Sequence, residues 1–509
     1  MKRQFNRRDF LKLAGIAPAG FFVPPLEQSL GIIQPRQADR KNVLVVVFDA
    51  FSARHISLYG YERETTPNMA RLAKRAKVYH NHYAAGSFTT PGTASLLTMT
   101  LPWTHRAIRF QGTVSNRYAD KSVFHAFDDY HRLAYSHNDL VNLLFDQFQG
   151  SINEYIPQDK LLLFNDGYIR ALFGGDEDIA TVSWGRAVKS VEAGYAYSLY
   201  LSHLYQSVFD TYRDKKISGI KDDYPYGLPG INVDNYYVLE QGIDWLAGRI
   251  SELPQPFFTY CHFLPPHNPY RPSREFAGAF TNDSWKPPDK PDDFFTQDIS
   301  PESMAKMRAY YDEFILNVDS EFGRLFDLLE SSGLLDDTWV VLTSDHGEMQ
   351  ERGISGHTTP TLYQPITRVP LMIFEPGNQT GQEIHSLTSA VDVMTTLLYV
   401  TGHDIPAWSE GAVLPPFNSS PAGNRIYAVQ AKNNNPELPL KKGTVMQVDG
   451  NYKLVYYFGY DELGGGELVQ LFDLAADPQE LDELSAAKKG VASELLATLK
   501  SKLKEADNP

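Results

Sequence analysis

The sequence contains very little cysteine and no excess of positive charge. Its one cysteine among 509 residues is Cys261. A single cysteine excludes disulfides within the chain and any cysteine-rich metal site, and it is expected to be a small buried apolar residue. The chain carries 62 acidic and 47 basic side chains, with no long basic run after the first dozen residues. This balance argues against nucleic-acid binding and predicts a soluble acidic protein.

Long hydrophobic runs are also missing, and the N-terminus has a pattern of its own. No later segment approaches the roughly 20 apolar residues of a transmembrane helix, so no membrane span is expected in the mature body. Arg7 and Arg8, followed by Phe10-Leu11-Lys12, precede a short apolar stretch at 13–23. This resembles a twin-arginine signal, although a frayed basic terminus is the alternative. We predict that residues 1–40 are a signal and linker, and that the twin-arginine machinery exports the chain to the periplasm, cell surface or exterior.

Apolar runs and one helical pattern indicate an α/β sheet. The run 42–48 is continuous rather than alternating, which suits a strand buried on both faces. Similar runs recur at 257–263, 339–343 and 369–374. Between the second and third of these four runs, spacings of three and four mark one helix face: Tyr311, Phe314, Val318, Phe322, Leu325 and Leu329. The order strand, helix, strand predicts a large, mostly parallel sheet flanked by helices, within a domain over 41–424.

The last part of the chain has a different composition. From about residue 425, short aromatic runs occur at 452–458 and 468–472. They predict a small antiparallel sheet within 425–509, closed by a C-terminal helix from about 487 to 504. The segment 145–235, rich in tyrosine, phenylalanine, glycine and aspartate, fits neither pattern. It is expected to form either a lid or substrate wall, or a helical surface elaboration.

Charged residues follow two of the predicted strands directly. Asp49 comes after the first strand, and Asp345 and His346 come after the strand 339–343. Open α/β sheets bind ligands at the carboxyl ends of their strands. Two carboxylates and an imidazole at that edge could hold a divalent ion. Aspartates at strand ends also serve as helix caps, so spacing alone leaves the structural alternative open.

The segment 86–98 places threonines at the start of a predicted helix. Pro91 occupies the position of a first helical residue, Thr90 is placed as a cap, and Thr89 lies just outside the helix. The N-terminus of a helix favours an alkoxide or a phosphate or sulfate oxygen. A metal on the Thr89 hydroxyl would lower its pKa and generate a nucleophile near neutral pH. The simpler alternative is a pair of capping threonines.

Several segments in order resemble the signatures of the sulfatase family within the alkaline phosphatase superfamily. The segments that carry the resemblance are Asp49, 59–61 with 66–68, 89–98, 262–270, 344–369, 452–454 and 471–474. Together they cover nearly everything from residue 41 onward except roughly 145–235. The resemblance implies an alkaline phosphatase/sulfatase-like sandwich with the large mixed sheet, the small antiparallel sheet and the final helix.

The nucleophile motif departs from the family pattern. Sulfatases carry cysteine, converted to formylglycine, in a Cys-x-Pro-x-Arg motif, whereas this chain has Thr89-Thr90-Pro91-Gly92-Thr93. Formylglycine cannot form at Thr89, and neither can the hydrate whose collapse expels sulfate. The threonine resembles that of phosphoethanolamine and phosphoglycerol transferases and related hydrolases, in which it is esterified by the transferred group. The resemblance therefore implies a phosphate or sulfate ester hydrolase or transferase with Thr89 as nucleophile, and it favours phosphoryl chemistry.

The resemblance also implies one divalent metal ion and two substrate-facing histidines. The matched ligands are Asp49, Thr89, Asp345 and His346, while Ala50 replaces the second aspartate of the usual calcium-binding pair. Zinc or manganese is favoured, and calcium or magnesium stays open. His267, in the His-x-x-x-Pro-His-x-Pro-Tyr loop, matches a histidine that contacts the transferred group and is the candidate to bind its charge or protonate the leaving oxygen. His357 falls where relatives place a lysine or histidine that also faces the transferred group. Four residues are left outside the site: Glu348 and Arg368 as supporting or salt-bridge residues, and His80 and His82 as surface histidines.

Three functions follow from these observations. The first is a threonine-dependent phosphodiesterase, phosphomonoesterase or phosphotransferase. The second is a sulfuric ester hydrolase without formylglycine, and the third is a sulfatase-like binding module without turnover. Retention of all four matched ligands argues against the third, because an inactive site has no chemical need for them. The expected substrate is a small-molecule, lipid-head-group or carbohydrate ester, and no nucleic acid is expected as partner.

Overall fold

The computed structural model describes residues 40–163, 197–230, 236–281, 283–418 and 425–507. The proposed export signal lies outside these residues, apart from its last position. The segment 145–235 is described only in part, so its role as lid, wall or surface elaboration stays a prediction. Within the described residues, no helix combines the length and the apolar character needed to cross a bilayer.

A large mixed sheet forms the centre of the described chain. Its strands are β1 (Asn42–Phe48), β2 (Lys77–Tyr83), β3 (His131–Ser136), β4 (Glu154–Tyr155), β5 (Phe257–Phe263), β6 (Thr338–Thr343), β9 (Leu371–Phe374) and β10 (Gln382–Ser389). They are arranged in the order β10-β2-β9-β6-β1-β5-β3-β4. β1 pairs in parallel with β5 and β6, and β3 pairs in parallel with β5, whereas β9 runs antiparallel to both of its neighbours. The predicted mixed, mostly parallel sheet is confirmed.

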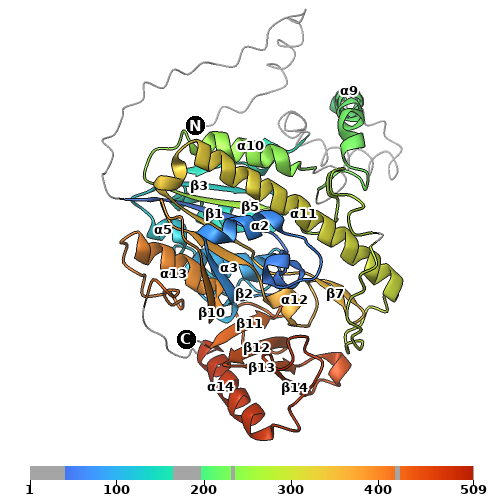
Figure 1. Ribbon diagram of the computed structural model, residues 1–509, viewed down its shortest axis with the longest axis vertical. Coiled ribbons are helices and arrows are strands. Elements are labelled where there is room, and N and C mark those ends of the chain that lie inside the picture. The colour runs from blue at the N-terminus through green and yellow to red at the C-terminus, as the bar shows by residue number, and fades with distance from the viewer. Residues whose placement is uncertain (1–39, 164–196, 231–235, 282, 419–424, 508–509) are drawn as a thin grey trace, which may run out of the picture. The chain divides into compact units, whose positions relative to one another are not determined.

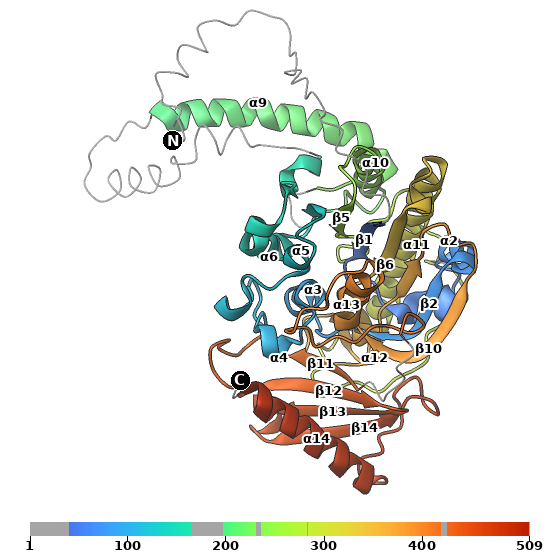
Figure 2. The same cartoon turned by 90° about the vertical axis from the view of Figure 1, so that its left-hand side faces the viewer.

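Helices cover both faces of this sheet. They are α2 (Pro67–Leu72), α10 (Leu239–Ile250) and α11 (Pro301–Ser331) on one face, and α3 (Thr89–Thr98), α5 (Val123–Ala126), α6 (Asp139–Phe148) and α13 (Ala390–Val400) on the other (Figures 1 and 2). Successive residues of β1 pack alternately against the first and the second set. All of β1 is therefore buried, which explains why its apolar run is continuous.

The helix expected before β6 is α11. Its predicted stripe, from Tyr311 to Leu329, packs against the sheet, and the helix ends at Ser331 as expected. It begins much earlier than the stripe, at Pro301. The reason is a local cap, since the Ser300 side chain accepts a hydrogen bond from the Ser303 N–H at 3.3 Å.

The C-terminal part forms a second sheet of antiparallel strands. They are β11 (Ile426–Gln430), β12 (Gly443–Asp449), β13 (Tyr452–Phe458) and β14 (Glu467–Asp473), with α14 (Lys489–Asp507) packed on one face (Figure 2). This confirms the predicted small sheet and closing helix. Its other face packs on the hairpin of β7 (Met349–Glu351) and β8 (Ile354–Gly356) and on α12 (Gln364–Thr367). Two described helices remain, α4 (Pro102–His105) and α9 (Tyr197–Ile220).

Two local predictions are wrong. α3 begins at Thr89 itself, with Phe88 at the N-cap position and no side-chain cap, so Thr90 does not cap the helix. The Thr90 hydroxyl is instead buried, and no described residue hydrogen-bonds to it. His82 is not at the surface, because β2 lies between β10 and β9 and buries it completely. Its Nδ1 lies 3.0 Å from the Thr388 hydroxyl. Cys261 is buried, as expected.

Candidate active site

The two acids predicted at the strand ends come together because parallel strands finish at one edge of the sheet. Val47 of β1 is in register with Thr343 of β6 and with His262 of β5. Asp49 and Asp345 each follow two residues beyond that level, so they meet at the carboxyl edge. Both carboxylates are fully buried.

Thr89 reaches this edge on the first turn of α3. One turn further along, Gly92 packs so closely that a Cβ there would lie 2.2 Å from the carbonyl oxygen of Asp345. The Thr93 hydroxyl also donates to Asp345 Oδ2 at 3.3 Å. The beginning of α3 is therefore packed directly against the end of β6, and Thr89 is buried beside the acids.

His346 Nε2 is the point at which the predicted site residues converge. It lies 3.3 Å from Thr89 Oγ1, 3.3 Å from Asp49 Oδ1 and 3.5 Å from Asp345 Oδ2. Nδ1 of the same ring lies 2.8 Å from the Gly347 carbonyl, to which it donates. That bond orients the ring and leaves Nε2 facing the three oxygens. The structure thus brings together all four residues predicted as metal ligands.

Two residues that the sequence did not single out support Asp49. Asn138 Nδ2 donates to Asp49 Oδ2 at 2.5 Å and to Thr89 Oγ1 at 3.4 Å. His262 Nε2 lies 3.3 Å from the same Oδ2 and 3.8 Å from Asp345 Oδ2. The other oxygen, Asp49 Oδ1, has no hydrogen-bond partner among the described residues although it is buried. One oxygen of Asp49 is therefore hydrogen-bonded by Asn138 and His262, whereas the other faces His346 Nε2 at 3.3 Å.

The charges of this cluster depend on one another. Burial would raise the pKa of the Asp49 carboxyl, but His267, His262 and His346 outweigh it and hold that pKa well below its usual value. Burial and the neighbouring Asp49 raise the pKa of Asp345. Burial would lower the pKa of His346, yet Asp345 and Asp49 raise it to about 9. A proton on His346 thus compensates the two carboxylates, and a divalent cation would take its place on binding.

The donor set fits a tetrahedral metal ion. Ligands about 2.0–2.1 Å from zinc are separated by about 3.3–3.4 Å along the edge of a tetrahedron. The distances from His346 Nε2 to Thr89, Asp49 and Asp345 are close to this value. Asp49, His262 and Asp345 also form a cluster with ligand atoms within 4.8 Å. We favour the set with His346, because His262 meets the occupied oxygen of Asp49.

The two predicted substrate-facing histidines line up beside this centre. The ring centroid of His357 lies 4.3 Å from that of His346 and 4.9 Å from that of His267. Nδ1 of His357 lies 3.2 Å from the buried carboxylate of Glu348. Burial lowers the pKa of His357 to about 4, so the neutral ring donates from Nδ1 to Glu348 and leaves Nε2 as an acceptor. Glu348 is a supporting residue, as expected.

The supporting residues escaped sequence analysis for different reasons. His262 lies inside β5, and only its register with β1 shows that it reaches the acids. Asn138 is the N-cap of α6, and its Oδ1 accepts the Leu140 N–H at 2.8 Å. Its place two residues after β3, which adjoins β5, is the signal that could have suggested it. Arg368 forms no salt bridge among the described residues and donates from Nε to the His80 carbonyl at 2.8 Å.

Comparison with known proteins shows which family the chain resembles. The family model "Sulfatase" matches residues 41–144 and 187–403, and "N-sulphoglucosamine sulphohydrolase, C-terminal" matches 358–508. Arylsulfatase K of Bos taurus is 27% identical over 294 residues, which cover 52% of this chain and 54% of that protein. The chain thus spans about half the length of that relative. Choline-sulfatase of Rhizobium meliloti (strain 1021) is 24% identical over 496 residues, covering 90% of this chain and 85% of that protein.

The solved structures confirm the predicted fold. The phosphonate monoester hydrolase of Agrobacterium radiobacter superimposes with a TM-score of 0.62 at 20% identity, covering 91% of this chain and 96% of that chain. The two proteins therefore share an architecture, although few of their residues are identical. Because the sulfatase family model matches more than half of the residues, and the fold agrees with the expectation from the motifs, this chain belongs to the sulfatase family.

Proposed function

We propose that this protein is an ester hydrolase or transferase that acts on phosphate or sulfate esters, with Thr89 as its nucleophile. The observation that carries the proposal is the position of the Thr89 hydroxyl. It lies on the first turn of α3, 3.3 Å from His346 Nε2 and beside two buried carboxylates. Within the described residues these carboxylates pair with histidines and with no lysine or arginine. A threonine with a structural role alone does not need this cluster of acids.

Asp49, Asp345, His346 and Thr89 would hold the divalent ion, with zinc or manganese favoured. When bound, such an ion supplies Lewis-acid polarisation and lowers the pKa of a coordinated hydroxyl. The N-terminus of α3 adds the positive end of its dipole to the same point. Asn138 donates to Thr89 Oγ1 and holds it in place at 3.4 Å.

The reaction has two steps. Thr89 loses its hydroxyl proton to solvent, its Oγ1 forms a bond to the phosphorus or sulfur atom, and the bond between that atom and the leaving oxygen breaks. His267 is the candidate to bind the transferred group and to give a proton to the departing oxygen, while His357, oriented by Glu348, faces the transferred group with its Nε2 acceptor. Water or an acceptor alcohol then attacks the threonine ester and regenerates the Thr89 hydroxyl.

Phosphoryl transfer is the first choice for chemical reasons. Phosphorus accepts an attacking water readily, whereas a threonine sulfate lacks the escape route that the formylglycine hydrate provides. Thr93 stands where the family motif has arginine, and its hydroxyl binds Asp345 instead. Sulfate ester hydrolysis is the second candidate, because the matched family model and both reported sequence relatives carry sulfatase names.

The test is to identify the group that becomes attached to Thr89. Metal-loaded protein is incubated with an aryl phosphate diester, a phosphate monoester and a sulfate ester, and peptide mapping by mass spectrometry follows. A phosphoryl adduct on Thr89 supports the first candidate, and a sulfated Thr89 supports the second. Absence of both adduct and turnover would indicate a binding module without catalysis.

A set of matched variants makes the result specific. Thr89→Ala should lower turnover about 10³-fold or more, while Thr89→Ser keeps the hydroxyl and should retain part of the activity. Thr90→Ala is the neighbouring control, since the Thr90 hydroxyl has no hydrogen-bond partner among the described residues. Equal turnover of Thr89→Ala and the wild type would refute the nucleophile assignment.

Export by the twin-arginine route is a separate proposal. It is supported by the order of residues 6–12 before the apolar stretch 13–23. Residues 1–40 fused to a folded reporter should direct it out of the cytoplasm, and replacing Arg7 and Arg8 by lysine should retain it inside. Equal export of both fusions would contradict the proposal.

A further inference from the structure

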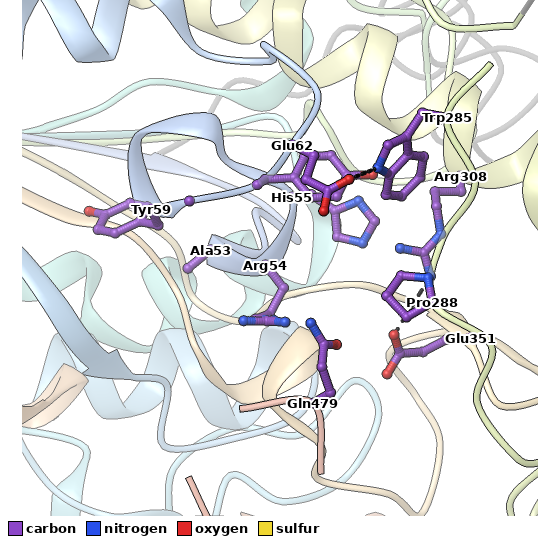
Figure 3. Close-up of a pocket in the computed structure, with 12 residues that line it drawn as sticks. Ala53, Arg54, His55, Tyr59, Glu62, Trp285, Pro288, Arg308, Glu351 and Gln479 are labelled. Atoms are coloured by element: carbon purple, nitrogen blue, oxygen red, sulfur yellow. Dashed lines mark hydrogen bonds and ion pairs between the residues drawn. The ribbon is translucent and has the colours of Figure 1, made fainter. Parts of the chain in front are cut away.

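A cavity distinct from the Thr89 centre opens beside the loop that follows β1. It has a volume of about 90 Å³, and none of the residues around Thr89 lines it. Its walls include Arg54, His55, Trp285, Arg308 and Gln479 (Figure 3). These side chains come from the loop after β1, the segment before α11, α11 itself and the C-terminal part. The cavity is thus assembled from four separate regions of the fold.

Two arginines in this cavity have unused binding capacity. Figure 3 shows the Arg54 and Arg308 guanidinium groups on two sides of the cavity, with the Gln479 amide beside Arg54. No carboxylate among the described residues pairs with Arg54. Arg308 is only 6% exposed, and its Nη2 donates to the Gln350 carbonyl at 2.6 Å, but its Nε has no partner among the described residues. A buried guanidinium N–H without an acceptor is costly, and a bound anion would supply one.

The acidic residues of the cavity do not cancel this positive charge. Glu351 lies 2.8 Å from Lys290, 3.6 Å from Arg308 and 3.8 Å from Arg352, so three cations share its carboxylate. These neighbours outweigh burial and lower the pKa of Glu351. Glu62 is exposed and accepts a hydrogen bond from Trp285 Nε1. The lining carries two arginines and two glutamates, and Lys290 and Arg352 are two further cations beside Glu351.

The walls are fixed by their own contacts. The Arg63 guanidinium lies 4.5 Å from the centroid of the Trp285 ring and forms ion pairs with Asp283 at 2.8 Å and Asp312 at 2.7 Å. Asp312 also accepts from His55 Nδ1 at 2.7 Å. Because Trp285 and His55 are held in this way, the cavity is preorganised, and little ordering is needed when a ligand enters.

We propose that this cavity is a binding site for a small tetrahedral oxyanion, inorganic sulfate or phosphate. Arginine forks bind such anions through paired, charge-assisted hydrogen bonds, and Arg54 and Arg308 approach from two sides. A volume of about 90 Å³ is large enough for one compact anion. The site does not depend on the chemistry proposed for Thr89.

The test is direct binding of radiolabelled sulfate to the full-length protein by equilibrium dialysis, with unlabelled phosphate as competitor. Arg54→Gln should weaken binding at this site about 10-fold or more, because a charged hydrogen-bond donor pair is lost. Arg54→Lys keeps the charge without the fork and should give an intermediate value. Arg71→Gln is the matched control, because Arg71 is exposed and pairs with Asp327 at 3.0 Å on the surface.

The Thr89→Ala variant distinguishes sulfate bound at the catalytic centre from sulfate bound in this cavity. The Arg54-dependent binding should be unchanged in this variant. Crystals soaked in selenate should show anomalous density between Arg54 and Arg308. Equal sulfate binding by wild type, Arg54→Gln and Arg54→Lys would overturn the proposal, as would selenate density confined to the Thr89 centre. If phosphate competes and acetate does not, the ligand is a tetrahedral oxyanion; competition by acetate alone would point to a carboxylate and contradict it.

Discussion

Gly92 offers a direct test of how closely α3 must approach Asp345. In the change Gly92→Ala, the new Cβ would lie 2.2 Å from the carbonyl oxygen of Asp345 and 2.9 Å from its carbonyl carbon. Both atoms belong to the backbone, so no rotamer change can relieve the contact. Ordinary contacts between such atoms begin near 3.4 Å, so α3 and the end of β6 must separate by roughly 1 Å.

This separation should affect activity more than stability. Overpacking of a buried contact costs about 1–3 kcal/mol of unfolding free energy. A displacement of about 1 Å between Thr89 and its neighbours should lower turnover about 10²-fold, because the reacting groups lose their alignment. Turnover of an aryl phosphate diester and urea unfolding followed by circular dichroism measure the two effects.

Gly248 provides the control for Gly92. It lies on α10, and a Cβ added there would meet nothing within 4 Å. Gly248→Ala should therefore leave turnover unchanged and raise the unfolding free energy by about 0.4–1 kcal/mol. If Gly92→Ala matches the wild type in both measurements, the close packing of α3 on Asp345 does not control the position of Thr89, and the reasoning fails.

Three further predictions concern charge. Chelation of the divalent ion should lower the unfolding free energy by about 4 kcal/mol for an ion present at 1,000 times its Kd, and with it the unfolding temperature, because Asp49 and Asp345 lose their counter-ion; calorimetry with and without zinc checks this, and an unchanged unfolding temperature would exclude a bound ion. Glu348→Ala should lower kcat about 10- to 100-fold, because His357 is no longer held in position. Glu348→Gln keeps a hydrogen-bond acceptor and should lower kcat by a smaller factor. An equal decrease in kcat for both variants would contradict a positioning role. Burial raises the pKa of Asp392 to about 6, so the folded state binds this proton more tightly than the unfolded chain does. As the pH rises from about 4 to 6, the contribution of Asp392 to the unfolding free energy should therefore fall, by at most about 1.4 kcal/mol per pH unit. Urea unfolding of wild type and Asp392→Asn at pH 4 to 7 should show a steeper fall in the wild type, because Asp319 also has a pKa of about 6 and contributes to both; identical slopes would refute the prediction.

Much of the fold could be predicted from the sequence because its strands are buried on both faces. The run 42–48 and the run 257–263 coincide with β1 and β5, and the stripe from Tyr311 to Leu329 lies on the buried face of α11. The small C-terminal sheet was predictable from its aromatic runs. The strand β2 was harder, since its histidines suggested a surface, and only its position between β9 and β10 buries His82.

The candidate site was predictable only where residues match a family motif. Asp49, Thr89, Asp345 and His346 were placed in this way, and the structure brings them together. Their catalytic and metal-binding roles stay predictions. His262 begins the family motif 262–270, but its contact with the acids could not be predicted, since it lies within a strand and reaches them only because β5 is paired with β1.

The sequence by itself determined the kinds of element and the chemical groups that follow them, because these depend on local periodicity and residue type. Only the tertiary structure decided which strand ends meet, since strand pairing joins residues far apart in the chain. It places Asn138 and His262 on one oxygen of Asp49 and His346 beside the other. It also forms the arginine cavity from regions that no local pattern connects.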